Sequence, residues 1–339
     1  MAASKPPLSA VGSVGELHLL NIIILVISVL SALGSGWMIL SFVLFESART
    51  FRHQLILGLA ISDFFMAANF MGSTTTQLAG HTLKGASCSV NGFATQWFVV
   101  QTDYWVLMIA VCTFSMLSDC KAQSKWIKSH RWVIWGLPWG LSVLWATIGL
   151  MLSGYGNIGA WCWFTKDRTR LLVNFIPRWL IIIAILTIYI RLYFIIYRAH
   201  ERFISLDVEA SGSRHSASHS VALVKSMANS TLSTDQPEVE ELQNQQRKRI
   251  SSQPHSRPAP TLKKLAYQML AYPLIYMLIW IIPTTIRIYQ ATTGKPAPFA
   301  IATVDKSCIV IQGFADAVIY GFNKANLAAW KEWIFDGRR

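Results

Sequence analysis

The sequence contains few charged residues. Asp, Glu, Lys and Arg make up 14% of its 339 residues, whereas soluble domains average about 25%. Its five cysteines are too few for a disulfide-stabilised scaffold. In contrast, 53% of the residues are hydrophobic and 14 are tryptophan, a residue that favours the membrane–water interface. This composition excludes a soluble globular protein and predicts an integral membrane protein with a single membrane domain.

Histidines do not gather inside the apolar part of the chain. All eight fall in predicted loops or at span ends, so no cluster is available to hold a metal in the membrane. We therefore expect no enzyme, no metal and no cofactor. The net charge of +13 does not indicate a nucleic-acid partner, because cytoplasmic loops of membrane proteins are normally basic.

Seven apolar segments are long enough to cross a bilayer, since a helix rises about 1.5 Å per residue and the hydrocarbon core is about 30 Å thick. The predicted fold is therefore an all-α membrane protein, a bundle of seven transmembrane helices. The segments cover about residues 17–45, 54–78, 90–117, 132–152, 171–197, 265–289 and 299–322.

Basic residues predict the orientation of the bundle. The loops after the first, third and fifth segments, together with the tail, hold 20 of the 30 Lys and Arg residues, and the opposite side holds seven. The positive-inside rule then places the N-terminus outside and the C-terminus in the cytoplasm of a multi-pass plasma-membrane protein. The predicted parts are an extracellular N-terminus (1–16), helices one to five (17–199), a third cytoplasmic loop (200–262), helices six and seven (263–323) and a cytoplasmic surface helix and tail (324–339).

Two cytoplasmic segments have distinctive compositions. Residues 200–262 are rich in Ser, Gln and Glu and have few large apolar residues, which predicts disorder. Within them, Ser251 follows a Lys-Arg-Ile sequence and is a candidate phosphorylation site, with a plain solvated linker as the alternative. After the last span, Leu327, Trp330 and Ile334 lie at helical spacing. This spacing predicts a short amphipathic helix on the inner leaflet.

The sixth span contains two prolines, Pro273 and Pro283. Each removes a backbone donor, a defect that membrane helices tolerate because neighbouring groups can satisfy the freed carbonyls. The span is therefore either a kinked structural element or a hinge, in which Trp280 would repack between the prolines.

Ionisable residues inside spans are costly and usually functional. Asp63 lies in the second span and Asp316 in the seventh, with Asn323 two turns later. Together they could bind a cation, share a proton or form a structural network.

A second group of charges lies nearer the predicted outer side. Asp103 is in the third span, and Arg178 and Arg287 are in the fifth and sixth. The arginines could extend to lipid head groups, or they could line an outer pocket for an anionic ligand. We place Trp163, from the neighbouring outer loop, at the same candidate ligand site. That loop also contains Lys166, Arg168 and Arg170.

Two cysteines lie on the predicted outer side. Cys88 precedes the third span and Cys162 lies in the following outer loop, so a disulfide is possible in an oxidising compartment. It would hold that loop over the third span. Cys112, Cys120 and Cys308 lie in spans or at their ends and are expected to be free thiols.

Several motifs resemble one family of receptors. They are LAISD at 59–63, WCW at 161–163, AYPLIYMLIWIIPTTIRI at 271–288 and QGFADAVIYGFN at 312–323. With the seven spans and the cysteine pair, they resemble the cyclic-AMP-receptor-like G-protein-coupled receptors of fungi and slime moulds over about residues 17–336, apart from the long loop. The resemblance implies coupling to the alpha subunit of a heterotrimeric G protein, and it leaves the ligand open, because slime-mould members sense cyclic AMP whereas fungal members are diverse. We expect an extracellular small molecule or nutrient as the ligand, an output that feeds cyclic AMP signalling, and contact with membrane lipid.

The chain departs from the rhodopsin-like receptor pattern at two places. Ser118-Asp119-Cys120-Lys121 stands where many receptors have Asp-Arg-Tyr, and the seventh span lacks Asn-Pro-x-x-Tyr, although Tyr320 and Asn323 could serve there. The rhodopsin-like switch therefore cannot be transferred directly. The residues expected to contact the G protein are Lys121, Lys125, Lys128, Lys263 and Lys264.

A seven-span transporter or channel is the main alternative function, and a scaffold that does not signal is a third. The odd number of spans, the long inner loop and the lack of a visible internal repeat count against a transporter.

Overall fold

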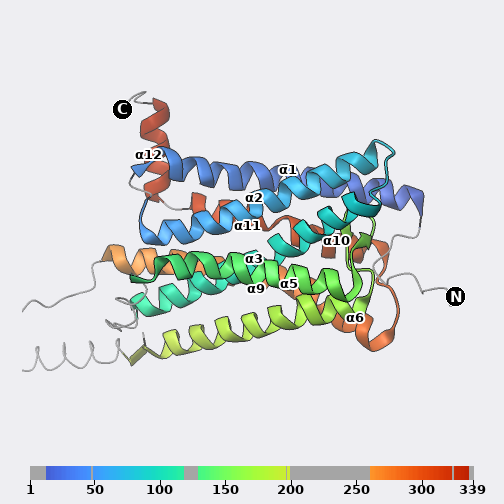
Figure 1. Ribbon diagram of the computed structural model, residues 1–339. Coiled ribbons are helices and arrows are strands. Elements are labelled where there is room, and N and C mark those ends of the chain that lie inside the picture. Colours follow the sequence, from blue (N-terminus) through green and yellow to red (C-terminus); the bar gives the residue numbers. More distant parts are fainter. Residues whose placement is uncertain are drawn as a thin grey trace, which may run out of the picture. The chain divides into compact units, whose positions relative to one another are not determined.

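The computed structural model describes residues 13–46, 49–117, 129–195, 197–198, 260–322 and 324–335. Residues 1–189 with 266–339 form one compact unit and residues 190–265 form a second; the sites described below lie in the first. The helices, shown in Figure 1, are α1 (Val14–Leu44), α2 (Phe51–Leu78), α3 (Gly85–Leu117), α5 (Arg131–Ser153), α6 (Asp167–Arg170), α9 (Pro260–Thr293), α10 (Phe299–Val310), α11 (Gln312–Gly321) and α12 (Lys324–Phe335).

Among the described residues, six helices are long and apolar enough to cross a membrane. They are Val14–Leu44, His53–Leu78, Gly85–Ser115, Arg131–Ser153, Asp167–Ile195 and Met269–Thr293. The helix Asp167–Ile195, called the 167–195 helix below, begins with α6 and passes through a π-helical turn, η2 (Leu171–Phe175). These helices match the first six predicted spans, and the predicted all-α membrane fold is confirmed.

The seventh predicted span is split into α10 and α11 at Ile311. In an unbroken helix the Phe314 N–H would donate to the Val310 carbonyl. Instead, the Ser31 hydroxyl of α1 donates to Val310 O at 2.6 Å and accepts from Phe314 N at 3.1 Å. A side chain inserted into the helical hydrogen-bond ladder is a recognised cause of a break. Neither half is therefore long enough to count as a span by itself.

Small residues allow the helices to approach closely. α1 packs against α2 and α11, and α3 packs against α2 and α5. A Cβ on Gly34 would lie 2.9 Å from the Ala317 Cβ, and one on Gly58 would lie 2.3 Å from the buried Trp105 ring. A larger residue at Gly34 would separate α1 from α11, and one at Gly58 would separate α2 from α3.

A disulfide and a two-stranded sheet shape the loop between α5 and α6, which is the predicted outer loop. β1 (Gly156–Asn157) pairs antiparallel with β2 (Cys162–Trp163), in a register that aligns Gly156 with Trp163. Cys162 is joined to Cys88 at the start of α3, with 5.4 Å between their Cα atoms. The predicted disulfide is confirmed, and it fixes β2 next to the N-terminal end of α3.

The predicted surface helix is present as α12. Its Trp330 indole donates to the Ser41 hydroxyl of α1 at 2.9 Å, and the ring packs edge-on against Phe45. Ile334 and Phe335 are exposed, which leaves an apolar end available to lipid.

Several predictions fall outside the described residues. These concern the long loop up to residue 259 with Ser251, the free thiol of Cys120, the position of Asn323, and the contact residues Lys121, Lys125 and Lys128. Lys263 and Lys264 lie in α9, but their side chains are outside the description. The structure describes Cys112 and Cys308 as free thiols, as expected.

Candidate functional site

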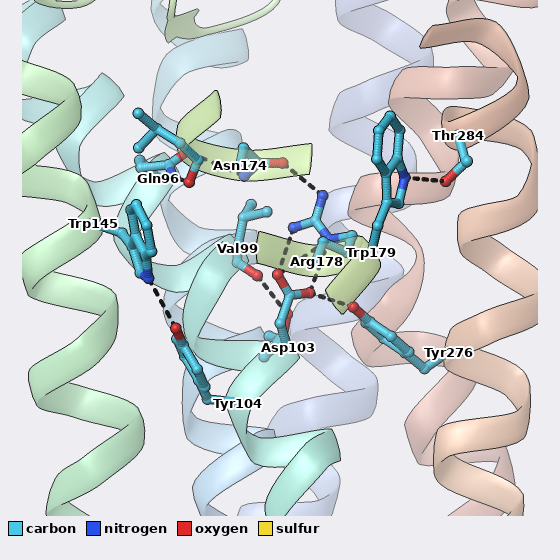
Figure 2. A network of polar contacts seen from close by, with 12 residues as sticks. Gln96, Val99, Asp103, Tyr104, Trp145, Asn174, Arg178, Trp179, Tyr276 and Thr284 are labelled. Carbon is cyan, nitrogen blue, oxygen red and sulfur yellow. Dashed lines mark hydrogen bonds and ion pairs between the residues drawn. The ribbon is translucent and has the colours of Figure 1, made fainter. Parts of the chain in front are cut away.

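The centre of the site is a buried ion pair between α3 and the 167–195 helix. Arg178 donates to Asp103 from Nε at 3.0 Å and from Nη2 at 2.8 Å. The Tyr276 hydroxyl of α9 donates to the same carboxylate at 2.6 Å. All three side chains are buried, at 0–1% exposed, and Figure 2 shows them converging from three helices. Because charges this deeply buried need partners, this contact constrains the relative positions of these helices.

The Arg178 guanidinium also contacts α9 through an aromatic ring. Its Cζ lies 3.4 Å from the centre of the Trp280 ring. A cation over a tryptophan face is attracted by the ring quadrupole, most strongly when both are desolvated. Arg178 therefore contacts α9 twice, directly at Trp280 and through Asp103 at Tyr276.

Hydrogen bonds connect this centre to the outer loop. Arg178 Nη1 donates to Asn174 Oδ1 at 2.6 Å, and Asn174 Nδ2 donates to Gln96 Oε1 at 3.2 Å. The Trp163 indole of β2 donates to the same Gln96 oxygen at 2.9 Å. An unbroken chain of polar contacts thus runs from β2, which contains Cys162 of the disulfide, to α9. Figure 2 shows the part of this chain from Gln96 to Tyr276. We call this chain of residues the relay; its members are Trp163, Gln96, Asn174, Arg178, Asp103 and Tyr276.

Pro177 explains why Gln96 is held in place. Proline has no N–H, so it cannot satisfy the carbonyl four residues earlier, which belongs to Val173. Gln96 Nε2 donates to that carbonyl at 3.3 Å. Val173 lies in the π-helical turn η2, a type of irregularity often found at functional sites.

A second polar cluster lies beside β2, between the 167–195 helix, α9 and α10. Arg287 donates to Gln290 Oε1 at 2.6 Å and to Asp305 Oδ2 at 3.2 Å. Lys306 donates to the Ile158 carbonyl at 3.1 Å. We call this group the outer cluster; with the ion pair between Arg170 and Asp167, its charged members are Arg170, Arg287, Lys306, Asp167 and Asp305.

The outer cluster contains more positive than negative charge. Three of its members are cationic and two are carboxylates, and all but Asp167 are at least 90% buried. Arg170 lies 5.6 Å from the Trp163 ring centre, so the cluster contacts the first residue of the relay. Arg287 Nε is buried with no hydrogen-bond partner among the described residues.

The two carboxylates singled out in the second and seventh spans come together. Asp63 and Asp316 lie beside each other and are both buried. Neither Asp63 oxygen has a hydrogen-bond partner within the described part of the chain. Tyr320 packs edge-on against Trp37 at 5.5 Å. The roles of these residues remain predictions.

The predicted ligand residues divide between the two clusters. Asp103 and Arg178 bind each other, Trp163 begins the relay, and Arg287 belongs to the outer cluster. Pro273, Trp280 and Pro283 all lie within α9, which continues through both prolines. The sequence reasoning missed Gln96, Asn174 and Tyr276, which carry no charge. It also missed the role of Asp305 and Lys306, although adjacent opposite charges in a predicted span are a usable indication.

The sequence matches a two-part family model. Residues 16–203 match the model described as G protein-coupled glucose receptor regulating Gpa2, and residues 257–332 match the C-terminal model of the same description. The chain belongs to this family of G protein-coupled receptors. The receptor is also 42% identical to the ascaroside receptor GPR2 of Arthrobotrys oligospora over 354 residues, covering 89% of this chain and 87% of that protein.

A more distant relative and one solved structure, the latter similar in fold alone, also resemble this chain. The receptor is 28% identical to the cyclic AMP receptor-like protein A of Dictyostelium discoideum over 148 residues, which is 43% of this chain and 37% of that protein. The crystal structure of squid rhodopsin has a TM-score of 0.61 at 19% identity, covering 94% of this chain and 85% of rhodopsin. The predicted resemblance to cyclic-AMP-receptor-like receptors is confirmed. These relationships give no support to the transporter or channel alternative, and they point to a receptor rather than an enzyme.

Proposed function

We propose that this receptor binds an extracellular small molecule at the outer cluster and activates the alpha subunit of a heterotrimeric G protein. The family description names glucose, and the relative at 42% identity is named an ascaroside receptor. Both names indicate small organic molecules supplied from outside the cell. The proposal places the receptor in the plasma membrane with the outer cluster facing the exterior.

The charge of the outer cluster favours a ligand with an anionic group. Its surplus cation, together with the unpartnered Nε of Arg287, would suit a carboxylate or phosphate oxygen. Guanidinium groups bind such oxygens through strong charge-assisted hydrogen bonds. A ligand that draws Arg287 away from Asp305 would therefore change the contacts between α9 and α10.

The relay carries this proposal, because it joins the outer loop to α9 without a gap. A ligand shifts a two-state receptor by its differential affinity for the two conformations. Moving Trp163 or Arg170 would disturb Gln96, and through it the position of Arg178 over Trp280. α9 would then pivot at Pro273 and Pro283. The predicted G-protein contacts, Lys121, Lys125, Lys128, Lys263 and Lys264, would be exposed at the inner end.

Two glutamines on α3 provide a matched test of the relay. Gln96 and Gln101 are both fully buried, but Gln101 makes no side-chain hydrogen bond within the described residues. Gln96→Leu leaves Trp163 and Asn174 without their acceptor, at about 1–3 kcal/mol per buried group. If the same 1–3 kcal/mol is lost from the coupling free energy between the outer cluster and α9, stimulated exchange should fall by roughly 5–150-fold. Gln101→Leu should have little effect.

The assay is nucleotide exchange on a purified Gα subunit by receptor in lipid nanodiscs. Glucose, an ascaroside and cyclic AMP are added in turn as probes, and binding of the active probe is measured separately. Gln96→Leu should retain binding and lose most of the stimulated exchange. Equal stimulated exchange by both glutamine variants and the wild type would refute the relay.

The hinge in α9 has its own test. Pro283→Ala restores an N–H that can donate to the Ile279 carbonyl, so α9 should stiffen and stimulated exchange should fall. Pro138→Ala in α5 is the control, because that proline also lies inside a helix. Full wild-type efficacy in Pro283→Ala would count against a hinge at this position.

A further inference from the structure

An apolar groove lies between the 167–195 helix and α9. Its volume is about 560 Å³. Residues lining one side include Trp179, Ile183 and Leu186, and residues lining the other include Leu278, Trp280 and Ile281. No charged residue lines the groove, and no member of the relay or of the outer cluster does so.

The groove opens to the hydrocarbon of the bilayer. Ile183, Leu278 and Ile281 are 56–58% exposed, and they belong to helices that are long and apolar enough to cross a membrane. The hydroxyls in its lining are already engaged: Thr285 donates to the Ile281 carbonyl at 2.8 Å, and Thr284 accepts from the Trp179 indole at 3.3 Å. An apolar space with few available polar partners does not hold ordered water.

The shape of the groove suits a hydrocarbon chain. Its lining on α9 extends from Leu274 to Thr285, which is about 17 Å at a rise of about 1.5 Å per residue. The groove therefore follows the helix axis, as the chains of surrounding lipids do. It is continuous with the lipid-facing surface of both helices. We propose that it holds one acyl chain of a bilayer phospholipid, packed against Trp280.

An acyl chain in this position would act on the relay. Trp280 is 1% exposed and carries the Arg178 guanidinium over its ring. A chain in the groove supplies dispersion contacts that an unfilled space cannot, and it occupies the volume into which Trp280 could move. Occupancy thus stabilises the conformation in which Trp280 lies under Arg178. This inference assigns a lipid site and does not depend on the ligand proposed for the outer cluster.

Photolabelling tests the site directly. The full-length receptor is placed in nanodiscs containing phosphatidylcholine with a diazirine in the middle of one acyl chain, and labelled peptides are mapped by mass spectrometry. Peptides covering 179–186 and 274–285 should be labelled several-fold more than the lipid-facing residues of α1 around Leu33, which is 67% exposed. No extracellular ligand or Gα subunit is needed, so a failure here is separate from a failure of the proposed function.

Two variants and a competitor complete the test. Leu278→Trp and, independently, Ile183→Phe fill the groove and should reduce its labelling to the level of α1, whereas Leu33→Trp should leave it unchanged. Uniform labelling of all lipid-facing helices would overturn the proposal, because it would indicate surrounding lipid only. Displacement of the label by a photoactivatable sterol at equal membrane content would also overturn it, by assigning the groove to a sterol.

Discussion

Removing the charge of Asp103 should destabilise the receptor strongly, and the structure gives the size of the effect. Asp103→Asn leaves the Arg178 guanidinium, 0% exposed, without its counter-ion. Breaking a buried ion pair in this way costs about 3–5 kcal/mol. Arg178→Met leaves the buried Asp103 carboxylate without its counter-ion, and the free energy of unfolding should fall by a similar amount. The double variant buries neither charge, so its loss should be well below the sum of the two single losses.

Tyr276→Phe provides the internal comparison. It removes one hydrogen bond to the carboxylate and retains the ion pair, so its expected loss is about 1.5–3 kcal/mol. The free energy of unfolding is measured by denaturant titration of purified receptor in which Cys120 and Cys308 are replaced by serine, followed through the reactivity of the Cys112 thiol, which is 1% exposed in the folded protein. If the losses of Asp103→Asn and Arg178→Met simply add in the double variant, the two side chains are not partners and the site described here is wrong.

Two further predictions concern the scaffold. Cys88→Ser removes a cross-link between residues 74 apart and should lower stability by about 2–4 kcal/mol; an equal response of this variant and the wild type to reductant would contradict it. Gly58→Ala places a methyl group 2.3 Å from the Trp105 ring and should cost about 1–3 kcal/mol. Gly72→Ala in the same helix meets no atom within 4 Å and should be neutral or gain up to about 1 kcal/mol, as thermal unfolding will show.

The sequence predicted the helices because hydrophobic length is a strong indicator in a membrane protein. It also predicted the disulfide, since both cysteines fell on one side of the membrane. Charged residues inside spans drew attention to Asp103, Arg178 and Arg287, which are buried in the structure; their part in ligand binding stays a prediction. Their partners were not predictable, because contacts between distant helices depend on the rotation of each helix about its axis. No pattern along the chain sets that rotation for Gln96.

Local irregularities of the helices could not be predicted from the sequence either. Pro177 was visible, but the composition did not show that Gln96, 81 positions earlier in the sequence, would donate to the carbonyl that this proline leaves unsatisfied. Likewise, Ile311 lies in an apolar run that reads as continuous helix. Its interruption arises from a serine on another helix, which no local reading of residues 299–322 can reveal.

That serine has a consequence for how the bundle can move. Ser31 replaces one rung of the last membrane helix, so the N- and C-terminal halves of that helix are both tied to α1 through a single oxygen. Bending at Ile311 cannot occur without stretching one of these bonds or carrying α1 along. The first and last helices should therefore shift as a pair, and any movement of α9 would take place against both of them together.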